Sequence, residues 1–158
     1  NPQQRLEGYA RIIGCERCQR TLRTRMVDQY VLDELADHGS VTPEALRGFE
    51  HQNRVRGAEL MSEHGDLVKV CQAADGGDAC PVLAAWDKTS NVNSVGNHIF
   101  EEFVKRIPKK GLFVGGPYKV FFDKNDAENT PRDLDETNPK TIRAIRKRSR
   151  TCARRTSR

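Results

Sequence analysis

The sequence predicts an α+β fold that is mostly helical, with a few short strands near its C-terminal end. Two patterns predict this fold. Apolar residues recur at helical spacing through most of the chain before Pro108, most clearly at Val95, Ile99 and Phe103. Runs of β-branched and aromatic residues follow only after the Pro- and Gly-containing break at 108–111. We therefore expect a mostly helical body over residues 1–138 and treat residues 139–158 as a separate basic tail.

The first expected helix runs from Gly14 to His38. It carries two adjacent apolar rows, Leu22/Met26/Tyr30 and Val27/Val31/Leu35. Gly39 is placed to end it in a left-handed cap, and Thr42-Pro43 to begin the next helix as N-cap and first-turn proline. The helices that follow are expected at about Thr42–Phe49, Asn53–Ser62, Asp66–Cys71, Asp78–Trp86 and Ser94–Ile107.

Two short strands are expected after the last of these helices, at Leu112–Val114 and Tyr118–Phe122. The turn residues Gly115-Gly116-Pro117 separate them. The polar stretch 123–136 is predicted to be an ordered surface loop.

The net charge of +5 is concentrated in the tail. Nine of the 27 basic residues lie in 139–158, which contains no acid, whereas residues 1–138 carry 18 bases against 22 acids. A polyanion partner would therefore have to bind the tail alone. No apolar run approaches the roughly 20 residues that span a bilayer, so no membrane partner is expected.

The cysteines give two candidate pairs. Cys15-Glu16-Arg17-Cys18 is a CxxC, but no second CxxC or HxxxH supplies further zinc ligands and no strand precedes it, as a redox dithiol motif requires. We interpret both cysteines as small residues in the first turn of the first helix. Cys71 and Cys80 flank a Gly-rich loop, and from the residues alone a disulfide and two buried thiols are equally plausible.

No metal site and no cofactor are predicted, because the four histidines show no ligand spacing and no nucleophile motif. Trp86 is interpreted as a packing anchor at a helix end. The dense arginines Arg17, Arg20, Arg23 and Arg25 are the remaining candidates. Spacings of three place the first three on one helix face, and one guanidinium is hypothesised to point into a polar site and bind an anionic or amide-bearing group.

Several sequence blocks recur in one known family when taken together and in order. They are Asn1-Pro2-Gln3-Gln4, Ile12-Ile13-Gly14, Glu16–Arg25, Asn53-Arg54 with Ala58-Glu59-Leu60, Cys80 with Val82–Asp87, Gly96 with His98–Phe100, and Asn129–Arg132. Over about residues 1–138 the chain resembles the late β-subunit of penicillin acylase-like N-terminal nucleophile hydrolases, nearest to the branch of acyl-homoserine lactone, aculeacin and cyclic lipopeptide acylases.

The resemblance implies an αββα sandwich that hydrolyses an acylated amide, with an N-terminal Ser, Thr or Cys as nucleophile and its own α-amine as base. Residue 1 is Asn, so we expect the nucleophile and the oxyanion Asn to belong to the remainder of the precursor, which is the expected partner, and the isolated chain to be inactive. A supporting Arg of the family maps onto Arg20, with Arg23 as second choice. A family cysteine pair maps onto Cys71 and Cys80, which favours the disulfide and a periplasmic or secreted location.

The tail departs from the family pattern. Residues 139–158 are expected to be disordered or out of the family's reading frame. The alternative function is a small nucleic-acid-binding protein that uses this tail, although the body is acidic and the tail has no aromatic residue to stack on bases. A CxxC metal or redox module is a third, weaker reading.

Overall fold

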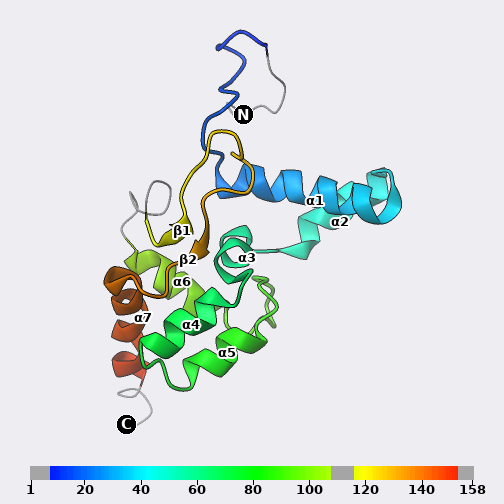
Figure 1. The fold of residues 1–158 in the computed structure, drawn as a ribbon. Coiled ribbons are helices and arrows are strands. Elements are labelled where there is room, and N and C mark those ends of the chain that lie inside the picture. The colour runs from blue at the N-terminus through cyan, green and yellow to red at the C-terminus, as the bar shows by residue number, and fades with distance from the viewer. Residues whose placement is uncertain (1–7, 108–115, 153–158) are drawn as a thin grey trace.

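The computed structural model describes residues 8–107 and 116–152, with side chains up to Arg146 (Figure 1). The elements in chain order are α1 Leu22–His38, α2 Pro43–Gln52, α3 Arg56–Ser62, α4 Asp66–Ala73, α5 Ala79–Ala85, α6 Asn97–Arg106, β1 Tyr118–Val120, β2 Arg132–Leu134 and α7 Pro139–Cys152. This part of the chain is α+β, mostly helical, with two short strands late in the sequence, as the sequence predicts. The αββα sandwich stays a prediction.

The body of the molecule consists of α3 to α7 around the β1–β2 hairpin, and α1 with α2 extends from it as an arm (Figure 1). The helices of the body pack on one another, α4 against both α5 and α7, and α3 against β2. Their inward side chains form one core cluster, in which Met61, Leu67, Phe103 and Leu134 are almost fully buried. Because α1 contacts α3, its N-terminal half lies against this body while its far end projects.

The start of α1 differs from the prediction. The helix begins at Leu22 rather than Gly14, because the Thr21 hydroxyl accepts a hydrogen bond from the Thr24 amide and so caps the first turn. Two other predicted signals are confirmed. Gly39 ends α1 with φ of 71°, and the Thr42 hydroxyl accepts from the Ala45 amide at the start of α2.

Only one of the two apolar rows predicted for α1 faces the body. Met26 is 8% exposed, whereas Val27 is 57% and Leu35 43% exposed. Apolar burial therefore fixes one narrow side of α1, and other contacts must set its orientation.

The two strands form an antiparallel pair in which Tyr118 lies opposite Leu134 and Val120 opposite Arg132. β1 is shorter than predicted and leaves Phe121 57% exposed. The prediction of a surface loop over 123–136 is wrong for its last part, since β2 lies there and Leu134 is completely buried. A three-residue strand with one core side chain carries too little alternation to be recognised in sequence. The strand expected at 112–114 lies outside the described residues.

The tail region forms α7, whereas disorder or a foreign reading frame was expected from residue 139. Asn138 precedes it, and its side-chain oxygen accepts from the Lys140 amide. Thr141, Ala144 and Ile145 are buried at i, i+3 and i+4, and α7 packs on α4 and α6. The division of the chain at residue 138 stays a prediction. Among the described helices, none combines the length and the apolarity needed to cross a bilayer.

Candidate functional site

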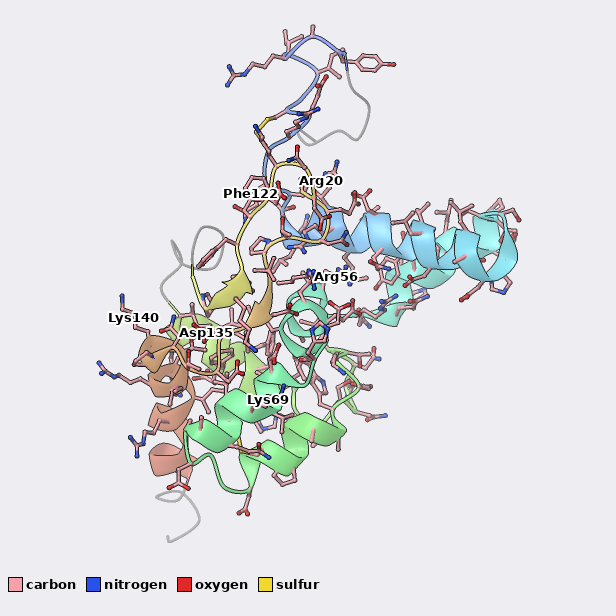
Figure 2. All side chains as sticks on the ribbon, in the orientation of Figure 1. Arg20, Arg56, Lys69, Phe122, Asp135 and Lys140 are labelled. Atoms are coloured by element: carbon pink, nitrogen blue, oxygen red, sulfur yellow. A yellow bond between two sulfur atoms is a disulfide. The ribbon has the colours of Figure 1, made fainter. Side chains whose placement is uncertain are left out.

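Arg20, the arginine singled out as a possible support for a reacting site, is buried just before α1 begins. It is 6% exposed and forms ion pairs with Glu128 and, at 3.7 Å, with Asp28. Glu128 belongs to the loop between β1 and β2, more than a hundred residues away in sequence. Figure 2 shows Arg20 where this loop meets the start of α1. Arg20 thus joins two distant segments through buried charge.

Arg25 is a second anchor of the same loop, and the sequence analysis had named it only as one of four candidate arginines. It is 2% exposed, and its guanidinium donates from Nε to the Glu128 carbonyl and from Nη1 to the Pro131 carbonyl, the latter at 3.2 Å. Burial, with the nearby Arg56 charge as a second cause, lowers the pKa of Arg25 to about 10. Its position in the sequence could have predicted this burial, because Arg25 lies three residues after Leu22 and beside Met26, on the inward stripe of the helix.

Arg23, the second choice, lies elsewhere. Its side chain is exposed and lines a mostly apolar hollow of about 500 Å³ with Leu22, Met26 and Phe100. The prediction that Arg17, Arg20 and Arg23 share one helix face is wrong, because the first two precede the helix. The structure therefore brings Arg20 together with Arg25, and separates both from Arg23.

A polar cleft of about 930 Å³ lies between α1, α3, the 87–89 segment and the 126–132 segment. Both basic and acidic groups line it, with Arg54, Arg56 and Arg132 facing the same space as Glu59 and Asp126. Figure 2 places Arg56 between α1 and α3. The mixed charge suits a polar ligand that offers both donors and acceptors, and not a purely anionic one.

One wall of the cleft is a tight network around Arg54. This guanidinium donates to Glu59 at 2.6 Å and to Asp33 at 2.8 Å, and it stacks over the Tyr30 ring 5.3 Å from its centroid. Despite partial desolvation, these two carboxylates raise the pKa of Arg54, and Arg54 with Gln29 holds the pKa of Asp33 low. The network ties α1 to α3, which supplies the orientation that apolar burial of α1 leaves open.

Both cysteine pairs lie at disulfide-bonding distance. Cys71 and Cys80, the pair implied by the family resemblance, have Cα atoms 5.5 Å apart and lie within the core cluster. The interpretation of Cys15 and Cys18 as first-turn helix residues is wrong, since they precede α1 and are bonded to each other with Cα atoms 5.5 Å apart. A disulfide leaves no thiol to act as nucleophile at these four positions.

Trp86 packs as the sequence predicts. It is 3% exposed, its indole N–H donates to the Thr89 carbonyl at 3.0 Å, and its ring lies 5.3 Å from that of Phe100. Two histidines have acidic neighbours: His38 lies 3.2 Å from Glu34 on α1, and His64 lies 3.0 Å from Asp133.

Comparison with known proteins identifies the family to which this chain belongs. The sequence model of the family described as penicillin amidase matches residues 2–157, so the chain belongs to the penicillin amidase family. It is 30% identical over 159 residues to aculeacin-A acylase of Actinoplanes utahensis, an alignment that covers 90% of this chain and 19% of that protein. It is 29% identical over 153 residues to acyl-homoserine lactone acylase PvdQ of Pseudomonas fluorescens strain Pf0-1, covering 92% of this chain and 18% of that relative.

The chain thus spans about a fifth of the length of the relatives it matches. The match includes the α7 region, which the sequence analysis had set apart from the family pattern.

Proposed function

We propose that this chain is a segment of an acylase that hydrolyses a linear amide and releases its acyl group. The observation that carries the proposal is the family match over residues 2–157. In addition, the two relatives described above are both named acylases. Their names point to different substrates, an aculeacin and an acyl-homoserine lactone, so the substrate class is an amide with an acyl chain on a polar amine. Lipopeptides and β-lactam antibiotics belong to the same class.

In this proposal the rest of the precursor supplies the N-terminal nucleophile, its α-amine and the oxyanion Asn, within an αββα sandwich. The present chain supplies a rigid support. Arg20 is favoured for that role over Arg23, because Arg20 is buried and held by Glu128 and Asp28 whereas Arg23 is exposed. A fixed guanidinium can hold a polar group in place for reaction, and a mobile one cannot. The cysteine pairs favour an oxidising, exported location.

The test compares the 158-residue chain with the complete product of its natural gene. Each is incubated with an N-acyl-homoserine lactone, a lipopeptide and a penicillin, and the released amine is measured. We expect release from the complete product alone. Amine release by the 158-residue chain would show that the missing groups are not needed. A complete product that cleaves no acylated amide would refute the acylase function.

The support role is tested in the active protein with a matched pair of substitutions. Arg20→Ala is expected to lower kcat by about tenfold or more while circular dichroism stays unchanged. Arg23→Ala should leave kcat within about twofold, since its side chain is exposed. Equal kcat in the two variants would show that Arg20 does not support catalysis, and the acylase proposal would still stand.

A further inference from the structure

Three side chains from separate segments converge beside the hairpin. They are His64 in the turn between α3 and α4, Asp66 at the first position of α4, and Asp133 in β2. Each offers one ligand atom, and these atoms all lie within 4.8 Å of one another. None of the three residues lines the polar cleft.

Asp66 is the most unusual member of this cluster. Its side chain is 1% exposed, and its Oδ1 is approached by Lys69 at 3.3 Å and Lys119 at 3.2 Å. Its other oxygen, Oδ2, is buried and has no hydrogen-bond partner among the described residues. A buried carboxylate oxygen needs a donor or a cation, because water can no longer solvate it.

The other two members complete a donor set of one imidazole and two carboxylates. Asp133 is 11% exposed and its Oδ1 lies 3.0 Å from His64 Nδ1, while its Oδ2 accepts from Arg132 at 3.3 Å. His64 is 60% exposed, so an ion could reach the cluster from solvent. Imidazole nitrogen with carboxylate oxygen suits Zn²⁺ and similar transition metals, whereas Mg²⁺ and Ca²⁺ prefer oxygen ligands alone.

We propose that His64, Asp66 and Asp133 form a binding site for a divalent transition metal such as Zn²⁺, with water in the fourth position. The ion would join the α3–α4 turn to β2, a strand that already lies against α3 and α4. Lys69 and Lys119 already balance part of the negative charge, and their ammonium groups oppose the ion. The affinity of the site for the ion therefore depends on these two lysine charges, and removal of one of them raises it.

The binding experiment uses the untagged full chain carrying Cys152→Ser, so that no free thiol competes for metal. After treatment with EDTA, Zn²⁺ is titrated by calorimetry and Co²⁺ by visible absorption. We expect one saturable site and a rise in melting temperature with Zn²⁺. Ca²⁺ at the same concentration should produce neither effect. A chain that shows no saturable Zn²⁺ binding overturns the proposal.

Three substitutions locate the site. His64→Ala should weaken Zn²⁺ binding by about tenfold or more, and it removes an exposed side chain that the core does not need. His51→Ala, an exposed histidine on α2, is the matched control and should bind as the parent chain does. Lys69→Met should tighten binding by about threefold or more, because a neighbouring positive charge is lost. Unchanged binding by His64→Ala, or weaker binding by Lys69→Met, would overturn the assignment.

Discussion

Replacing Arg25 by alanine is predicted to destabilise the fold far more than replacing Arg23 on the same helix. Arg25 is 2% exposed and donates to the carbonyls of Glu128 and Pro131. A hydrogen bond from a charged group contributes roughly 1.5–3 kcal/mol, so the pair contributes about 3–6 kcal/mol before costs. Burial of the guanidinium, which also lowers its pKa to about 10, offsets part of this. We expect a net loss of about 2–4 kcal/mol in the free energy of unfolding.

The assay is urea unfolding followed by circular dichroism, with thermal melting alongside. For a chain of this size the loss corresponds to a fall of roughly 5–15 °C in melting temperature. Arg23→Ala, which removes an exposed guanidinium, should change stability by less than about 0.5 kcal/mol. The loss of stability for Arg25→Lys should lie between these two values, because one ammonium cannot donate to both carbonyls in the geometry of the planar guanidinium. Equal losses from Arg25→Ala and Arg23→Ala would refute the reasoning.

Two further predictions concern the core. Gly96→Ala should lower the free energy of unfolding by about 2 kcal/mol or more, because a Cβ there would lie 2.7 Å from Trp86 and the backbone has φ of 126°. Gly48 lies inside α2 with open space around it. Gly48→Ala should therefore raise the free energy of unfolding by about 0.5–1 kcal/mol in the same urea assay. If both variants shift alike, close packing does not fix Gly96. Burial raises the pKa of Tyr118 to about 12, so the folded chain keeps a proton that the unfolded chain loses above pH 10. The contribution of Tyr118 to stability should be complete below pH 10 and be lost as pH rises towards 12. Relative to its own stability at neutral pH, Tyr118→Phe should therefore be more stable at alkaline pH than the parent chain, and an identical alkaline profile for the two proteins would contradict this.

The helices could be predicted because their signals are local. In α1, α2 and α6 apolar residues repeat within one or two turns, and caps such as Thr42 and Gly39 act over three or four residues. A reader of the sequence has all of this information inside a short window. The start of α1 was predicted wrongly although its signal is also local, because the analysis did not take Thr21 as the N-cap.

The candidate site could be predicted only in part, because its partners are distant. Arg20 could be selected by family resemblance, yet its contact with Glu128 spans 108 positions and leaves no periodic trace. Arg25 reaches the same loop over 103 and 106 positions. β2 could not be predicted from the sequence for a related reason, since its three residues gain strand geometry only from pairing with β1.

These long-range polar contacts explain how a chain with few aromatic residues orients α1. Apolar burial holds only the row that contains Met26, while Val27 and Leu35 stay exposed. Arg20 and Arg25 fix the helix start to the 123–131 loop, and Arg54 fixes α1 to α3. Hydrogen bonds and ion pairs depend on direction more steeply than apolar contacts do, so they set the angle of α1 more narrowly. A helix held in this way can present a guanidinium at a defined position, which is what the proposed support of an amide-cleaving site requires.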